Sequence, residues 1–187
     1  MTESNSNLKG KHILAVDDEE DILETIEDIL DDAILDFAKD YETASDKIRT
    51  TKYDLAILDI MGVNGMKLLE EAVKREIPCV MLTAHAMNPE SLMESIRKGA
   101  ISYLPKESLT DLDELLSDLL QAHELGQPSW KILFERLGDY FDQRFGKDWK
   151  KKDKAFWSEF KCNYQNQISR GIQERLKSNK NIIDKGI

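Results

Sequence analysis

Short apolar runs alternate with amphipathic stretches through the first 122 residues of the chain. The runs are strand-sized and rich in Ile, Leu, Val and Ala, which is typical of strands buried on both faces of a sheet. Between them, apolar residues recur every three or four positions, as on the buried face of a surface helix. We predict strands at 12–16, 33–38, 53–58, 78–82 and 101–104, and helices at 20–30, 43–51 (with Thr43 as N-cap), 66–74, 89–98 and 108–122.

Five strands that alternate with five helices predict an α/β fold. The expected architecture is a (βα)5 doubly wound parallel five-stranded sheet with helices on both faces, followed by an α-helical C-terminal segment. The connections are short, so each crossover should be right-handed. Ligands of such sheets bind beyond the carboxyl ends of the strands, and functional side chains are therefore expected directly after the strands.

The charge of the chain changes sign near residue 124. Residues 1–123 contain 12 basic and 27 acidic side chains, a net charge of −15, whereas residues 124–187 contain 14 basic and 9 acidic side chains, a net charge of +5. The sequence at 126–129, Gly-Gln-Pro-Ser, is also typical of a break between segments. Both observations indicate a domain boundary there.

We therefore predict three segments. Residues 1–10 form a mobile N-terminal arm, and residues 11–123 form the α/β domain. Residues 124–187 form a helical extension with two helices, at about 129–146 and 154–178, whose apolar residues have helical spacing. Two such helices have little core of their own, so docking against a partner or homodimerisation is expected.

Several classes of protein are excluded by composition. No apolar run approaches the roughly 20 residues of a membrane-spanning helix. The polar N-terminus lacks the apolar core of a signal peptide. Cys79 and Cys162 are the two cysteines, and they have neither paired nor metal-ligand spacing. These features predict a reduced, cytoplasmic setting.

Polar and charged side chains follow four of the predicted strands. Asp17 and Asp18 follow the first strand, Asp59 the third, Thr83 the fourth and Lys106 the fifth. Residues 19–21 continue an acidic run that is more typical of a solvated helix start. Three carboxylates at one edge of a sheet would repel one another unless a cation lay between them. An oxygen-rich site of this kind suits Mg²⁺, and one carboxylate could then act as a nucleophile toward a phosphoryl group.

This set of residues resembles the receiver domain of bacterial two-component response regulators, the family of the chemotaxis regulator with a flavodoxin-like fold. The resemblance covers about residues 11–123. It implies a phosphoprotein that accepts a phosphoryl group from a histidine kinase or phosphotransfer protein, with Mg²⁺ as cofactor. Its own activity would be limited to self-phosphorylation and self-dephosphorylation. The features that carry it are Asp17-Asp18, Asp59, Thr83-Ala84, Tyr103 and Lys106.

The resemblance also implies a role for each residue of the site. Asp59 would be the phosphoacceptor. Asp18 would bind Mg²⁺ directly, Asp17 would hold it through water, and the backbone carbonyl of Met61 would be a further ligand. The remaining positions would respond to the phosphoryl group: Thr83 as the switch hydroxyl, Tyr103 as the aromatic that moves with it, and Lys106 as the partner first of the acceptor and then of the phosphoryl oxygens.

The loop after Asp59 departs from the family pattern. It is two residues shorter than usual, and Val63 stands where a proline is common. Gly62 and Gly65 can absorb unusual backbone angles there, so the shortened loop does not exclude phosphorylation. Glu107 replaces a common proline after Lys106, so that peptide bond should be trans.

Three alternatives to a switch of protein–protein contacts stay open. The basic and aromatic C-terminal helices could bind DNA, although a mild +5 beside −15 argues against nucleic acid. The shortened loop could leave a pseudo-receiver scaffold that is not phosphorylated. An Asp-based phosphatase of the haloacid dehalogenase type would need a second Asp where Met61 stands. The sequence favours a response regulator.

Overall fold

The computed structural model describes residues 8–84 and 88–161, and the chain divides into two compact units between Gln121 and Ala122. The first unit contains a five-stranded sheet of order β2-β1-β3-β4-β5 in which all neighbours are parallel. The prediction of a doubly wound parallel sheet followed by helices is therefore confirmed. Its strands are β1 (His12–Val16), β2 (Ile34–Ala38), β3 (Leu55–Asp59), β4 (Cys79–Thr83) and β5 (Ser102–Pro105).

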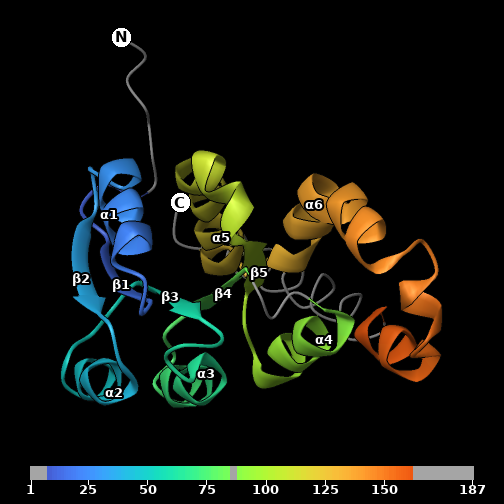
Figure 1. The fold of residues 1–187 in the computed structure, drawn as a ribbon, viewed down its shortest axis with the longest axis horizontal. Helices are drawn as coiled ribbons and strands as arrows, with labels where there is room; N and C mark the ends of the chain where they lie inside the picture. Colours follow the sequence, from blue (N-terminus) through green and yellow to red (C-terminus); the bar gives the residue numbers. More distant parts are fainter. Residues whose placement is uncertain (1–7, 85–87, 162–187) are drawn as a thin grey trace, which may run out of the picture. The chain divides into compact units, whose positions relative to one another are not determined.

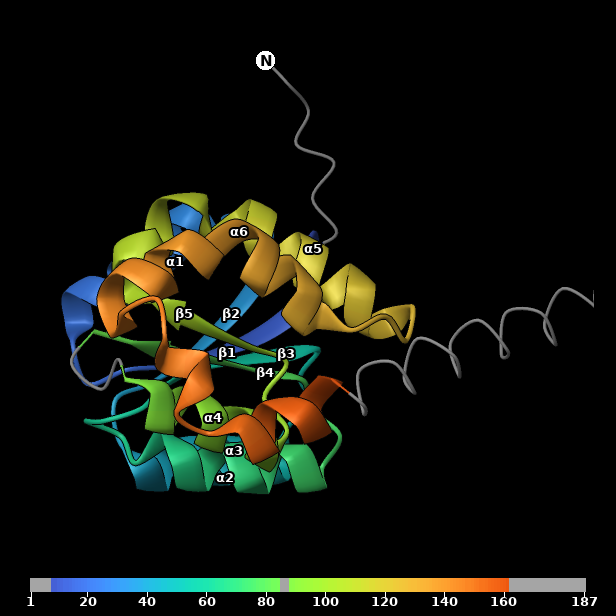
Figure 2. The same cartoon turned by 90° about the vertical axis from the view of Figure 1, so that its right-hand side faces the viewer.

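Helices cover both faces of the sheet. Helices α1 and α5 lie on one face, and α2, α3 and α4 lie on the other (Figures 1 and 2). Among the described residues, no helix combines the length and apolarity needed to cross a bilayer. The helical bounds are α1 (Glu20–Ile29), α2 (Tyr41–Thr50), α3 (Gly65–Lys74), α4 (Pro89–Lys98), the 3₁₀ helix η1 (Lys106–Asp111) and α5 (Leu112–Glu124).

The core is built on the central strands. Every residue of β3 and β4 is buried, because these strands have neighbours on both sides and helices on both faces. This explains why the central strands are the most continuously apolar runs of the sequence. The carboxyl ends of β1 and β3 lie side by side, since Val16 pairs with Leu58. The acids that follow them are thus brought together.

Capping residues set the ends of two helices. Asn88 caps α4, with its Oδ1 accepting from Ser91 N at 2.8 Å, and Gly99 ends the helix at a φ of +97°. For α2 the prediction was wrong: Asp40, not Thr43, is the N-cap, and it accepts a hydrogen bond from Thr43 N at 2.8 Å. The helix therefore begins two residues before the predicted position.

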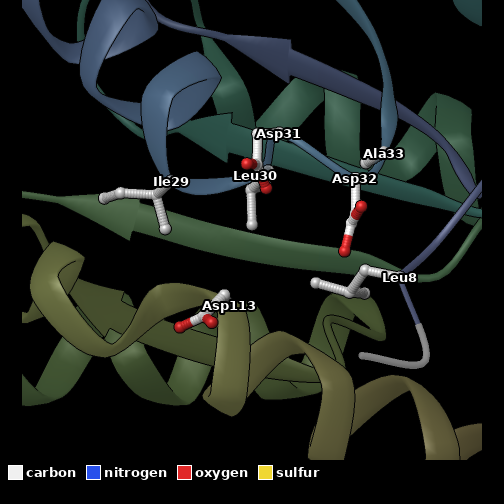
Figure 3. A pocket seen from close by; sticks show the side chains of 7 residues that line it. All are labelled: Leu8, Ile29, Leu30, Asp31, Asp32, Ala33 and Asp113. Atoms are coloured by element: carbon white, nitrogen blue, oxygen red, sulfur yellow. The ribbon is translucent and has the colours of Figure 1, made fainter. Parts of the chain in front are cut away.

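The described chain begins with a packed residue at the amino end of the sheet. Leu8 is only 1% exposed, and Gly10 N donates to Asp32 O at 2.9 Å. Leu8 lies beside a pocket of about 20 Å³, room for roughly one water, between the α1–β2 loop and Asp113 of α5 (Figure 3). The structure thus packs Leu8, which lies within the range predicted as a mobile arm, and residues 1–7 lie outside the described part.

Tyr53 connects the start of β3 to β2. The residue is 3% exposed, and its hydroxyl donates to Asp36 Oδ2 at 2.6 Å. Burial, together with this bond, raises the pKa of Tyr53 to about 12. The same hydrogen bond lowers the pKa of Asp36.

A pH-dependent loss of stability is expected from Tyr53. Its folded pKa lies above the unfolded value of about 10, so its contribution is complete below that pH and is lost as pH rises toward 12. At neutral pH, Tyr53→Phe should lower the free energy of unfolding by about 1 kcal/mol. Between about pH 9 and 11 the difference between wild type and variant should narrow by about 1 kcal/mol. Urea titrations across this range measure it, and a constant difference would contradict the assignment.

The second unit contains α6 (Ser129–Phe145) and a short 3₁₀ helix, η2 (Trp149–Lys151). A further helix begins at residue 154 and is described as far as 161. Asp153 caps it, because its Oδ1 accepts from Phe156 N at 2.9 Å. Residues 162–178 of the second predicted helix lie outside the described residues.

Candidate functional site

Three carboxylates converge at the carboxyl edge of the sheet. Asp17 and Asp18 follow β1, and Asp59 is the last residue of the adjacent β3. One carboxylate oxygen of each lies within 4.8 Å of the others. Asp17 is 1% exposed and Asp59 is 4% exposed, whereas Asp18 is exposed. The predicted acidic cluster is therefore present.

Lys106 supplies positive charge to this cluster from the end of β5. It is the first residue after β5, and its Nζ lies 2.8 Å from Asp17 Oδ2 and 3.2 Å from Asp59 Oδ1. Burial lowers the pKa of Lys106, but hydrogen bonds to Asp17 and Glu19 outweigh burial and raise that pKa well above its usual range. The ammonium is therefore charged across the physiological range.

The Asp17 carboxylate would be stabilised by a second cation in addition to Lys106. Burial raises the pKa of this carboxyl above its usual value, and the hydrogen bond from Lys106 offsets burial only in part. Its Oδ2 forms no hydrogen bond within the described residues, although it makes the ion pair with Lys106. A buried carboxylate oxygen with a free lone pair, beside two further carboxylates, fits a hard cation such as Mg²⁺.

Asp59 is held rigidly by its own loop. Its Oδ2 accepts hydrogen bonds from Met61 N at 2.9 Å and from Gly62 N at 3.1 Å. Its Oδ1 faces Lys106. One oxygen is thus fixed by backbone donors, and the other lies beside the ammonium.

The loop after Asp59 has a different geometry from the expected one. The left-handed backbone angle falls on Asn64, at a φ of +56°, and neither Gly62 nor Gly65 has a positive φ. The left-handed conformation that a glycine would allow is thus not used at either glycine. They are needed for close approach instead: a Cβ on Gly62 would lie 1.9 Å from Asp18 Oδ1, and one on Gly65 would lie 1.9 Å from the Asp59 carbonyl oxygen. The Met61 carbonyl accepts from Asn64 N at 3.4 Å.

The two predicted switch residues are both buried. Thr83 ends β4 and pairs in register with Pro105, the residue before Lys106. Tyr103 lies on β5, and its hydroxyl lies 2.7 Å from Ser91 Oγ of α4. Tyr103 thus connects β5 with α4, and Thr83 lies beside the end of β5 that precedes Lys106.

Glu19 belongs to the site, which sequence reasoning missed. Its Oε1 lies 2.7 Å from Lys106 Nζ, and its N–H donates to Asp17 Oδ1 at 3.0 Å. The acidic run that begins at Asp17 could have indicated that Glu19 belongs to the site. Residues 19–21 were instead interpreted as a solvated helix start. Glu20 fits that reading better, since it forms a half-exposed ion pair with Lys39.

Comparison with known proteins agrees with this geometry. A model of the response regulator receiver domain family matches residues 13–119. The two-component response regulator ARR10 of Arabidopsis thaliana is 32% identical over 104 residues, which are 52% of this chain and 19% of that protein. The alkaline phosphatase synthesis transcriptional regulatory protein PhoP of Bacillus subtilis (strain 168) is 30% identical over 127 residues, 64% of this chain and 52% of that protein.

Solved structures agree as well. The CheY-like response regulator receiver domain protein of Methanospirillum hungatei JF-1 is 29% identical, with a TM-score of 0.56 over 62% of this chain and 97% of that one. The chain spans about half the length of PhoP and less than a fifth of ARR10. A receiver domain is a phosphoacceptor rather than a catalytic enzyme, and it implies a partner histidine kinase. The family match over more than half of the chain, on this sheet with this acidic cluster, shows that the chain belongs to the response regulator receiver domain family.

Proposed function

We propose that this chain is a response regulator in which Asp59 accepts a phosphoryl group and thereby changes protein–protein contacts of the receiver or of the helical segment after residue 124. The observation that carries the proposal is the setting of Asp59. The carboxylate is buried, is held by two backbone N–H groups, and faces Lys106 at the edge where Asp17 and Asp18 also lie.

The proposed reaction is transfer from a phosphohistidine of a histidine kinase or phosphotransfer protein. An oxygen of Asp59 bonds to phosphorus as the P–N bond breaks, and the electron pair stays on the donor imidazole, which takes up a proton. The product is an acyl phosphate on Asp59. Because Lys106 already lies 3.2 Å from Asp59 Oδ1, its ammonium can stabilise the phosphoryl oxygens.

The acids of the site would hold the cofactor. Asp18 and Asp59 would bind Mg²⁺ directly, Asp17 would hold it through water, and the Met61 carbonyl would be a further ligand. When bound, Mg²⁺ neutralises charge that develops on the phosphoryl oxygens. The exposed position of Asp18 leaves that carboxylate accessible to an ion arriving from solvent.

The response would pass through Thr83 and Tyr103. The Thr83 hydroxyl would turn to donate to the phosphoryl group, and Tyr103 would move with it. The Tyr103 hydroxyl lies at hydrogen-bond distance from Ser91 of α4, so a movement of Tyr103 would alter the surface formed by α4 and β5. Such a surface could recruit a protein target, a second copy of the chain, or the helical segment.

The experiment is a titration of beryllofluoride, a phosphoryl mimic, with Mg²⁺ into the full chain and into Asp59→Asn, read by amide hydrogen exchange. We expect added protection around Asp59, Thr83 and Lys106 in wild type alone, by about tenfold or more in exchange rate. Protection changes after residue 124 would identify the helical segment as the output.

A matched control is Asp54→Asn, which removes an exposed carboxylate that accepts from His12 N before β3 begins. This variant should respond as wild type does. No response in wild type would contradict the proposal and indicate a pseudo-receiver scaffold. An equal response in wild type and Asp59→Asn would show that the mimic binds elsewhere.

A further inference from the structure

The second unit is held together by aromatic side chains. Phe134 and Phe141 of α6 contact each other at a centroid distance of 6.2 Å, and Trp149 of η2 contacts Trp157 at 5.1 Å. The Trp149 indole N–H donates to Asp142 Oδ1 at 2.9 Å. The cluster therefore fixes the η2 turn against the helix that begins at residue 154.

A pocket of about 340 Å³ lies between that turn and that helix. Residues 154, 157, 158 and 161 have the spacing of one helical face, and residues 150 and 151 come from the turn before it. A volume of this size is typical of a small-molecule site. The lining residues are Lys150, Lys151, Lys154, Trp157, Ser158 and Lys161.

The described residues of the lining are rich in hydrogen-bond donors, and none of them is a carboxylate. Within the described residues, the ammonium groups of Lys154 and Lys161 make no hydrogen bond or ion pair, whereas that of Lys151 pairs with Asp148 at 2.5 Å. Lys150 Nζ lies 4.8 Å from the centre of the Phe134 ring, which orders it beside the pocket. Lys151 already has a carboxylate partner, so an anion in the pocket would reduce the repulsion among the other three ammonium groups.

Trp157 lines the pocket with its ring, because its indole Nε1 has almost no exposed surface. The residue is 7% exposed, and its indole Nε1 is buried with no hydrogen-bond partner in the described part of the chain. A buried N–H without an acceptor costs free energy. The other indole of the cluster, that of Trp149, has its acceptor in Asp142.

We propose that this pocket binds a phosphate-bearing small molecule, held by the ammonium groups of Lys154 and Lys161. Ammonium groups are common phosphate ligands in proteins. The compact pocket favours a small, multiply charged anion over a long polyanion, which the net charge of −10 on the whole chain would repel. This site is separate from the acidic cluster, and the proposal is independent of the phosphorylation of Asp59.

The test is calorimetric titration of sodium pyrophosphate into the full chain at low salt, with a second titration of ATP to distinguish free phosphates from nucleotides. The double variant Lys154→Gln, Lys161→Gln should bind at least about tenfold more weakly. The matched control Lys131→Gln removes an exposed ammonium of α6 that pairs with Glu135, outside the pocket. It should bind within about twofold of wild type.

Absence of binding by both anions, or equal binding by wild type and the double variant, would overturn the proposal. Binding of duplex DNA without binding of pyrophosphate or ATP would also overturn it and assign the lysines to a nucleic-acid surface.

Discussion

Gly65→Ala should destabilise the receiver domain by about 3 kcal/mol, near the upper end of the usual cost of forcing extra volume into a packed site. An added Cβ would lie 1.9 Å from the Asp59 carbonyl oxygen, 2.8 Å from the Asp59 carbonyl carbon and 3.2 Å from Ile60 Cα. All three are backbone atoms. None can move aside as a flexible side chain would.

The backbone in question belongs to the centre of the sheet. Asp59 pairs in register with Leu82 of β4, and Ile60 N donates to Leu82 O at 3.2 Å. Displacing this segment would also disturb Gly65 N, which donates to Ile60 O at 3.2 Å where α3 begins. The methyl group would therefore push α3 away from β3 or break hydrogen bonds between β3 and β4.

Amide hydrogen exchange of β3 and β4 is the measurement for Gly65→Ala. Tryptophan fluorescence is not suitable, because Trp130, Trp149 and Trp157 all lie after residue 124 and report on the helical segment. The control is Gly138→Ala in α6, where an added Cβ meets nothing within 4 Å. This control should leave β3 exchange unchanged and should stabilise α6 by up to about 1 kcal/mol. Unchanged β3 and β4 exchange in Gly65→Ala would contradict the prediction.

Much of this fold could be predicted because its signals are local. A run such as residues 12–16 is apolar since both faces of the strand are buried, and the parallel topology follows from the alternation of strands and helices. The start of α4 could also be predicted, since Asn88 and Pro89 act within a few residues of one another. Asp17, Asp18 and Asp59 converge because the sheet places the ends of β1 and β3 together.

The features that the sequence did not reveal depend on residues that are distant in sequence and come close only in the folded chain. Glu19 has the sequence of an ordinary helix-start acid, and it becomes part of the site only because Lys106, 87 residues away, reaches its carboxylate. Gly62 is adjacent to Asp18 in space and not in sequence. The error at Thr43 is different, because Asp40 and Thr43 are both good caps and local pattern alone does not choose between them.

Gly62→Ala should damage the metal site and leave the fold intact. Its added Cβ would lie 1.9 Å from Asp18 Oδ1 and within 2.3 Å of the two other carboxyl atoms. These atoms belong to an exposed side chain that can rotate into solvent. Because Gly62 has no positive φ, alanine is compatible with its backbone. The free energy of unfolding should change by less than about 1 kcal/mol.

Gly62→Ala should instead weaken the binding of Mg²⁺, if Asp18 binds the metal directly as proposed. A carboxylate displaced from the cluster of Asp17, Asp18 and Asp59 can no longer share an ion with the other two. We expect the affinity for Mg²⁺ to fall at least about tenfold, which corresponds to about 1.4 kcal/mol. Calorimetric titration of MgCl₂ measures this, with Asp18→Asn expected to show a similar loss and Gly138→Ala none.

Comparison of the two glycine variants distinguishes a loss of folding stability from a loss of metal binding. They lie three positions apart in one loop, yet one added methyl group meets the backbone of β3 and the other meets the side chain of Asp18. Gly62→Ala should therefore stay folded while losing its response to beryllofluoride at the Mg²⁺ concentration that saturates wild type. An affinity for Mg²⁺ within about twofold of wild type in Gly62→Ala would mean that Asp18 does not need its present position to bind the metal. The direct role assigned to that carboxylate would then be wrong.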